Sequence, residues 1–111
     1  MKNCQAIQFE QFGEPDVLQW KSIAMPRLNE QQLLLKVAAA GVNPIDAKIR
    51  EGSSFVAQNL SLPSGLGFDV CGEVIAVGKH TEGFSNGDLV LGCAALEHPS
   101  TYAQYLSLIH I

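Results

Sequence analysis

The sequence predicts a mostly β protein of one domain, either a barrel or a sandwich, with one short helix. Short runs rich in Val, Ile, Leu and aromatic residues recur along the chain, and residues typical of turns separate them. A chain of 111 residues can bury one globular core but has no room for a second domain. The expected strands are residues 4–10, 17–24, 32–41, 69–78, 88–94 and 101–106.

The segments between these strands carry explicit turn signals. GEPD occupies residues 13–16, MPRLNE residues 25–30 and SNGD residues 85–88. Within the last of these, Asn86-Gly87 suits a turn that needs a positive φ. Strand and turn should therefore account for most of the chain.

One segment, NPIDAKIREG, breaks the β pattern and predicts a helix over residues 44–50. Asn43 is a good N-cap, and Pro44 fits the first helical position. Asp46 would lie at N3, near the positive end of the helix dipole, and Gly52 can close the helix. Because a proline favours extended geometry in the residue before it, Asn43 should stand at the corner between a strand and this helix. Such a corner can aim a side chain into a cleft.

Composition excludes several classes of function. The chain has 7 Lys and Arg against 11 Asp and Glu, and its basic residues are scattered, which argues against nucleic acid and acidic membranes as partners. The three cysteines are far apart and form no CxxC motif, as expected for reduced thiols. No apolar run has the length of a signal peptide or a membrane span. We expect a cytoplasmic protein.

Familiar catalytic motifs are absent from the sequence. The glycines of GLGFDVCG, residues 65–72, do not have the GxGxxG spacing, and strand-like residues follow them, so a phosphate loop is disfavoured. His80 and His98 have no partner at the spacing of a zinc site. No serine or cysteine stands in a nucleophile elbow.

Two segments together resemble a known family. AGVNPIDAKIREG (40–52), followed by LPSGLGFDVCGEVIAVGKHTEGFSNGDLV (62–90), resembles the N-terminal, GroES-like half of a medium-chain dehydrogenase/reductase of the zinc-free quinone oxidoreductase branch. The resemblance covers roughly residues 4–105 and implies a GroES-like, partly open β-barrel. Its most specific part is the spaced set Gly67, Asp69, Gly72, Val74, Val77, Gly78, Phe84, Gly87, Asp88 and Val90.

The resemblance also indicates that no zinc is bound. Zinc alcohol dehydrogenases have a cysteine ligand at the position matching Asn43 and a histidine ligand at the position matching Phe68. An amide and a phenyl ring cannot replace a thiolate and an imidazole as tight zinc ligands. The cysteine-rich lobe that holds structural zinc in those relatives is absent too, since only Cys93 lies in that region.

The resemblance implies a role for Asn43. Members of this branch bind NADPH in a separate Rossmann domain and pass hydride to a quinone or an activated enone, while the GroES-like half covers the nicotinamide and the substrate. The Asn43 amide could donate to the carbonyl of the acceptor. Capping the helix is an equally good reading of this residue, and the two roles do not exclude each other.

Two carboxylates near this corner, those of Asp46 and Asp69, can be explained by roles in the fold. A capping box explains Asp46, and the matching acid in relatives supports the corner rather than reacting, while Asp46 also stays a candidate for binding the substrate or cofactor. A carboxylate that enters a buried strand needs a partner, so we expect Asp69 to pair with Lys48 or Arg50 on the helix.

Three apolar residues could form a wall for a flat ring. They are Ile45, Phe55 and Phe68, and each could equally belong to the core of the barrel.

The last residues, LSLIHI (106–111), do not continue the family pattern. The string is the translation of CTGTCTCTTATACACATC, the mosaic end of a transposase adapter used in sequencing libraries. We therefore expect residues 106–111 to be a non-native tail, so that His110 carries no functional argument. The alternative is a genuine apolar strand.

The domain organisation follows from the resemblance. Residues 1–105 would be an incomplete GroES-like domain without the Rossmann domain, and in this family a returning segment completes the first domain. We expect this chain alone to be inactive and the full-length enzyme to be a homodimer. The alternative is a co-chaperonin-like interaction module, but such modules carry a long mobile polar loop and no GVNPID corner.

Overall fold

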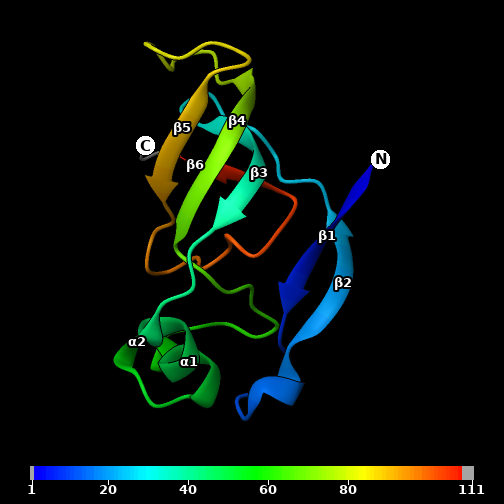
Figure 1. Cartoon of the computed structure of the whole chain (residues 1–111), viewed down its shortest axis with the longest axis vertical. Coiled ribbons are helices and arrows are strands. Elements are labelled where there is room, and N and C mark those ends of the chain that lie inside the picture. The colour runs from blue at the N-terminus through cyan, green and yellow to red at the C-terminus, as the bar shows by residue number, and fades with distance from the viewer. Residues whose placement is uncertain (1, 109–111) are drawn as a thin grey trace.

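The computed structural model describes residues 2–108, in which two antiparallel sheets stand above a pair of short helices (Figure 1). The strands are β1 (Asn3–Gln8), β2 (Gln19–Ala24), β3 (Leu33–Ala40), β4 (Asp69–Val77), β5 (Leu89–Cys93) and β6 (Tyr105–Leu108). The helices are α1 (Pro44–Glu51) and α2 (Phe55–Gln58), and a 3-10 turn, η1, spans Pro15–Val17.

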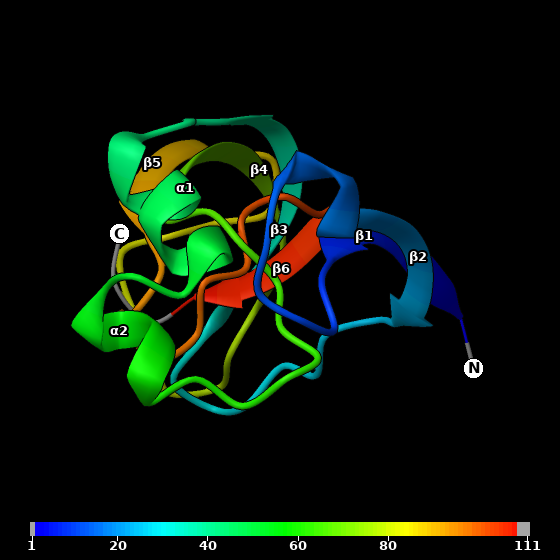
Figure 2. The ribbon, with the colours of Figure 1, turned by 90° about the horizontal axis from the view of Figure 1, so that it is seen from below.

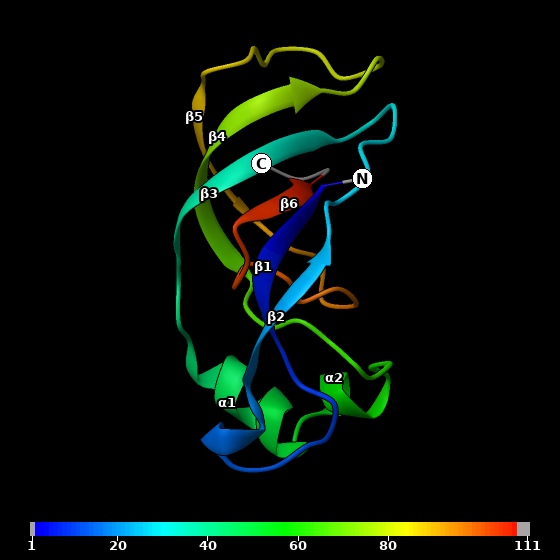
Figure 3. The ribbon, with the colours of Figure 1, turned by 90° about the vertical axis from the view of Figure 1, so that its right-hand side faces the viewer.

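The larger sheet has the strand order β5-β4-β3-β6, and β1 pairs with β2 in the smaller one. Seen from below, β5, β4 and β3 follow an arc (Figure 2). Within residues 2–108 the larger sheet keeps two edges, β5 and β6, and does not close into a barrel. The side view places both helices at one end of the molecule and the sheets at the other (Figure 3). The expectation of a mainly β, partly open architecture is confirmed.

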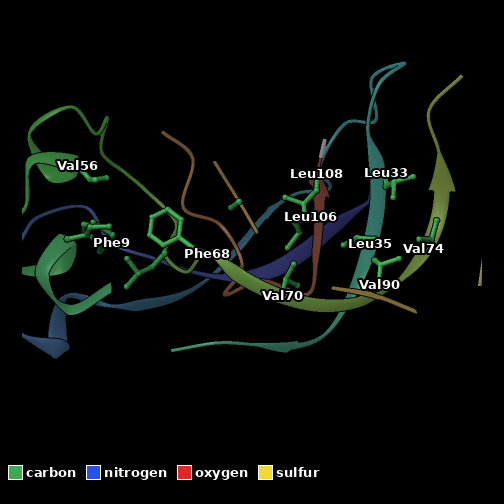
Figure 4. Close-up of a cluster of buried hydrophobic side chains, with 13 residues drawn as sticks. Phe9, Leu33, Leu35, Val56, Phe68, Val70, Val74, Val90, Leu106 and Leu108 are labelled. Carbon is green, nitrogen blue, oxygen red and sulfur yellow. The ribbon is translucent and has the colours of Figure 1, made fainter. Parts of the chain in front are cut away.

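Part of the core packs on one face of the larger sheet, where alternate residues of β4 are buried. Val74 pairs with Leu35, which also pairs with Leu106, and all three are buried. Their side chains, with those of Val90 and Leu33, gather on one side of the strands (Figure 4). Each buried aliphatic side chain of this kind contributes about 1.5–3 kcal/mol to stability.

The predicted helix is confirmed, and α1 extends one residue beyond it to Glu51. A second helix, α2, was not predicted. Its N-cap is Ser54, whose hydroxyl accepts a hydrogen bond from the Ala57 N–H at 3.2 Å. At four residues, α2 is too short for an apolar periodicity to reveal it.

The predicted tail falls partly outside the described residues, because 109–111 are not described. Residues 106–108 belong to β6 and pair with β3. That pairing does not test the origin of the tail, so its adapter origin stays a prediction.

Candidate functional site

The Asn43 corner joins the end of β3 to α1. Asn43 has extended geometry, with φ −126° and ψ 158°, and occupies the N-cap, while Asp46 lies at N3. The Asn43 backbone N–H donates to Asp46 Oδ2 at 2.9 Å, and the Asp46 N–H donates to the Asn43 carbonyl oxygen at 3.0 Å. The predicted positions of these two residues at the start of the helix are therefore confirmed.

The side chain of Asn43 points to the start of β4. Its Nδ2 donates to Asp69 Oδ2 at 2.8 Å. Because a carboxylate only accepts hydrogen bonds, this contact fixes which end of the amide faces Asp69. Gly41 brings the two segments together: its N–H donates to the Asp69 carbonyl at 2.9 Å, and a Cβ on Gly41 would lie 3.0 Å from Asp69 Cβ.

The expected pairing of Asp69 with Lys48 or Arg50 is wrong. Arg50 Nη1 donates to the Gly13 carbonyl at 2.5 Å, and its Nη2 lies 3.7 Å from Glu51 Oε1. Asp69 is exposed, so water solvates its carboxylate and no cation is needed to offset burial. The partner it does have is the neutral amide of Asn43.

Asp46, by contrast, is a buried carboxylate with only 3% of its surface exposed. Its Oδ2 accepts a second hydrogen bond, from the Tyr102 hydroxyl at 2.9 Å. Its Oδ1 has no hydrogen-bond partner among residues 2–108. Burial raises the pKa of Tyr102 well above its ordinary value, and the adjacent Asp46 carboxylate raises that pKa further.

Tyr102 is the residue of this site that the sequence did not reveal. It lies 56 residues from Asp46 along the chain, so no local spacing connects them. Its only sequence signal was its place near the start of the expected strand over residues 101–106.

The three residues proposed as an apolar wall are not in equivalent places. Phe68 is 7% exposed and belongs to the core, where it lies between Phe9 and Val70 (Figure 4). Ile45 is half-buried and packs against that core. Phe55, the first residue of α2, is 69% exposed. Phe68 is therefore a core residue, while a substrate-facing role for Ile45 and Phe55 stays a prediction.

A shallow hollow of about 450 Å³ lies beside Asp69, at the mouth of the corner. Strands β3, β4 and β5 line it with mostly small and apolar side chains. The lining residues are Ala39, Ala40, Gly41, Asp69, Val70, Cys71, Leu91 and Gly92. Of the two residues in the Asn43–Asp69 hydrogen bond, Asp69 lines this hollow.

Residues 29–107 match the alcohol dehydrogenase GroES-like domain family. The chain belongs to this family. It is 40% identical over 101 residues to the quinone oxidoreductase of Lama guanicoe, a match that covers 90% of this chain and 29% of that protein. It is 39% identical over 105 residues to the chloroplastic NADPH-dependent alkenal/one oxidoreductase of Arabidopsis thaliana, covering 91% of this chain and 27% of that protein.

Solved structures of quinone oxidoreductases also superpose on this chain. The quinone oxidoreductase from Coxiella burnetii superposes with a TM-score of 0.93 at 48% identity, over 96% of this chain and 34% of that one. The Escherichia coli quinone oxidoreductase complexed with NADPH superposes with a TM-score of 0.80 at 32% identity, over 95% of this chain and 31% of that one. The chain thus spans between 27% and 34% of the length of these relatives. The resemblance to the quinone oxidoreductase branch is confirmed.

The chemistry of the two residues that the resemblance matches to zinc ligands does not fit that metal. The Asn43 amide donates to Asp69, and the Phe68 ring is buried in the core. Neither group is a zinc ligand of the usual N, S or carboxylate type. Among the residues that the structure describes, no group of three or more His, Cys, Asp or Glu side chains could hold a metal ion.

None of the helices in the described part of the chain has the length and apolar composition needed to cross a membrane.

Proposed function

We propose that residues 1–105 are the substrate-side domain of an NADPH-dependent oxidoreductase that transfers hydride to a quinone or an activated enone without zinc. In this proposal a Rossmann domain outside the chain binds NADPH, and the full-length protein is a cytoplasmic homodimer. The observation that carries the proposal is the hydrogen bond of 2.8 Å from the Asn43 amide to Asp69. It holds a neutral donor at the position that the resemblance matches to a zinc ligand.

The relatives support the type of reaction. Their names are quinone oxidoreductase, alkenal/one oxidoreductase and 2-methylene-furan-3-one reductase, and each of these names specifies a conjugated carbonyl compound. The name of the Arabidopsis relative specifies NADPH, and the Escherichia coli structure contains it. These names favour an enzyme over the co-chaperonin-like alternative.

The chemistry at the corner follows from the amide itself. When bound, NADPH supplies the hydride. As the acceptor gains that hydride, negative charge develops on its carbonyl oxygen, and an aimed N–H donor stabilises the charge. Asn43 Nδ2 has two N–H groups, and its bond to Asp69 uses one of them. In this proposal the second N–H donates to the acceptor oxygen, and Asp69 holds the amide in the orientation that makes this possible.

The test uses the full-length oxidoreductase that carries these residues. We expect NADPH-dependent reduction of a quinone and of an alkenal, unaffected by a chelator, with less than stoichiometric zinc by metal analysis. Asn43→Ala should lower kcat for the quinone by about 10- to 100-fold, since removing one donor to a developing oxyanion costs about 100- to 1,000-fold in the strongest cases. Asn3→Ala, the same change at an exposed position on β1, is the control and should leave kcat unchanged.

Three results would overturn the proposal: a silent Asn43→Ala variant, stoichiometric zinc, or no turnover with NADPH. The 111-residue chain alone should not reduce quinone with NADPH. Turnover by this chain would show that the cofactor site does not lie outside it.

A further inference from the structure

Asp46 lies between two donors that come from distant parts of the chain. Its Oδ2 accepts the Asn43 backbone N–H and the Tyr102 hydroxyl, each at 2.9 Å. Its other oxygen, Oδ1, is buried and has no partner within the described residues. A carboxylate taken this far out of water depends strongly on the donors it has. The Tyr102 hydroxyl therefore donates one of the two hydrogen bonds that the Asp46 carboxylate receives within the described residues.

The position of Tyr102 is itself tightly fixed. Its backbone N–H donates to the Leu66 carbonyl at 3.0 Å, and its carbonyl accepts the Ile7 N–H at 2.8 Å. Its ring lies directly on the backbone of Gly67, where a Cβ would stand 2.6 Å from Tyr102 Cδ1 and 2.7 Å from Cε1. Gly67 has a φ of +95°, a conformation that glycine adopts without strain. The start of β4 is thus shaped so that this ring can reach Asp46.

These contacts form a chain that ends at the amide of Asn43. Tyr102 holds the Asp46 carboxylate, Asp46 holds the backbone of Asn43, and Asp69 holds the side chain of Asn43. A donor that stabilises a transition state must be in place before charge develops, because reorganisation during the reaction is costly. The Tyr102 hydroxyl can supply that fixed placement although it makes no bond to Asn43 itself.

We propose that Tyr102 is a positioning residue for the Asn43 corner: its hydroxyl fixes Asp46 and, through Asp46, the direction of the Asn43 amide. The inference rests on the function proposed above, in which Asn43 donates to the reducible carbonyl. It adds to that function a residue from the loop before β6, which contributes without touching the substrate.

The test is Tyr102→Phe in the full-length oxidoreductase, which removes the hydroxyl and keeps the ring. We expect kcat for quinone reduction to fall about tenfold, because a small misplacement of a catalytic donor has large effects on rate. The KM for the quinone and the Kd for NADPH should stay within about twofold, since the lost interaction acts in the transition state. Tyr105→Phe is the matched control, because the Tyr105 hydroxyl makes no hydrogen bond within residues 2–108. Its kcat should equal that of the unmodified enzyme.

A double-mutant cycle with Asn43→Ala separates positioning from general support of the fold. If Tyr102 acts through Asn43, Tyr102→Phe should have no further effect on kcat in the Asn43→Ala background. An additive loss, or a Tyr102→Phe variant with unchanged kcat beside an impaired Asn43→Ala variant, overturns the positioning role and leaves the proposed function intact. A silent Asn43→Ala variant overturns both.

Should Tyr102→Phe fail to accumulate as folded protein, Asp46→Asn interrupts the same chain of contacts at its middle member. This variant keeps an acceptor oxygen for the Asn43 N–H but removes the charge that the Tyr102 hydroxyl meets. We expect a fall in kcat that again disappears in the Asn43→Ala background. A loss that persists there contradicts the proposal.

Discussion

The two ends of β4 solve the same packing problem in different ways. Each end has a glycine against which another segment lies too close for a side chain. At the far end, a Cβ on Gly78 would stand 2.5 Å from the Asn29 carbonyl oxygen and 2.7 Å from that of Gln32. At the near end, a Cβ on Gly67 would stand 2.3 Å from the Thr101 hydroxyl oxygen. Backbone therefore occupies the space at one end, and side chains occupy it at the other.

This difference separates a contact between backbone segments from a contact that supports the proposed site. Around Gly78 the close approach serves backbone hydrogen bonds, from Gly78 to Gln32 at 2.8 Å and from His80 to Glu30 at 2.7 Å. Around Gly67 it admits a tyrosine whose hydroxyl reaches a buried carboxylate. The near end of β4 therefore lies beside a buried hydrogen bond between two side chains. At the far end, backbone hydrogen bonds join the segment after β4 to the loop before β3.

The largest effect should come from filling these two spaces. We expect Gly67→Ala and Gly78→Ala each to lower the free energy of unfolding by about 2–4 kcal/mol, because a methyl group must displace backbone or a fixed side chain. Gly67→Ala should be the more severe, since its positive φ adds about 1 kcal/mol of strain. Urea unfolding followed by circular dichroism measures both changes.

Gly83→Ala is the control for backbone strain alone. Gly83 has a φ of +88°, and a Cβ there would meet nothing within 4 Å. This variant should lose only about 1 kcal/mol. If Gly67→Ala costs no more than Gly83→Ala, the close contact with Thr101 and Tyr102 has no energetic weight, and the contrast between the two ends of β4 fails.

The sequence was a good guide to the fold because its signals were local. Short apolar and aromatic runs between turn residues predicted the strands, and the Asn43–Asp46 pattern predicted the start of α1, since both depend on neighbours within a few residues. η1 shifted the start of β2 to Gln19 because Pro15 and its neighbours form a turn rather than strand.

The site was predicted less well because its contacts are not local. Asn43 and Asp69 were both singled out, but their mutual bond across 26 residues was not foreseen. The expected cation partner for Asp69 followed from an assumption of burial, and the residue is exposed. Tyr102 could not be connected with Asp46, because only the folded chain brings a loop before β6 to the first turn of α1.

The two carboxylates that hold Asn43 should differ in their effect on stability. Asp46→Ala removes a buried group and leaves the Tyr102 hydroxyl and the Asn43 N–H without their acceptor, so we expect a loss of about 1–3 kcal/mol. Asp69→Ala removes an exposed group and should change the free energy of unfolding by no more than about 0.5 kcal/mol. Urea unfolding of the two variants makes the comparison. Equal losses would contradict the difference in burial on which this interpretation depends.

The smallest effect should appear in alkaline solution. Burial and the Asp46 carboxylate raise the pKa of Tyr102 in the folded chain, so the folded state holds this proton more tightly than the unfolded state. The unfolded chain loses its tyrosine proton as the pH passes about 10, and from there the free energy of unfolding falls. The contribution is complete below that pH and is lost as the pH rises toward the pKa of the folded state.

Two single variants of the 111-residue chain isolate this effect, because Tyr102 and Tyr105 are its only tyrosines. Melting temperatures are measured from pH 8 to above pH 10 for Tyr102→Phe and Tyr105→Phe. The Tyr105→Phe chain, which retains Tyr102, should lose melting temperature more steeply above pH 10. Cys4, whose pKa is raised by burial, and the lysines are common to both variants and cancel in the difference. Parallel curves would show that the Tyr102 proton does not distinguish the folded from the unfolded state, and that the contact with Asp46 is too weak to hold the corner.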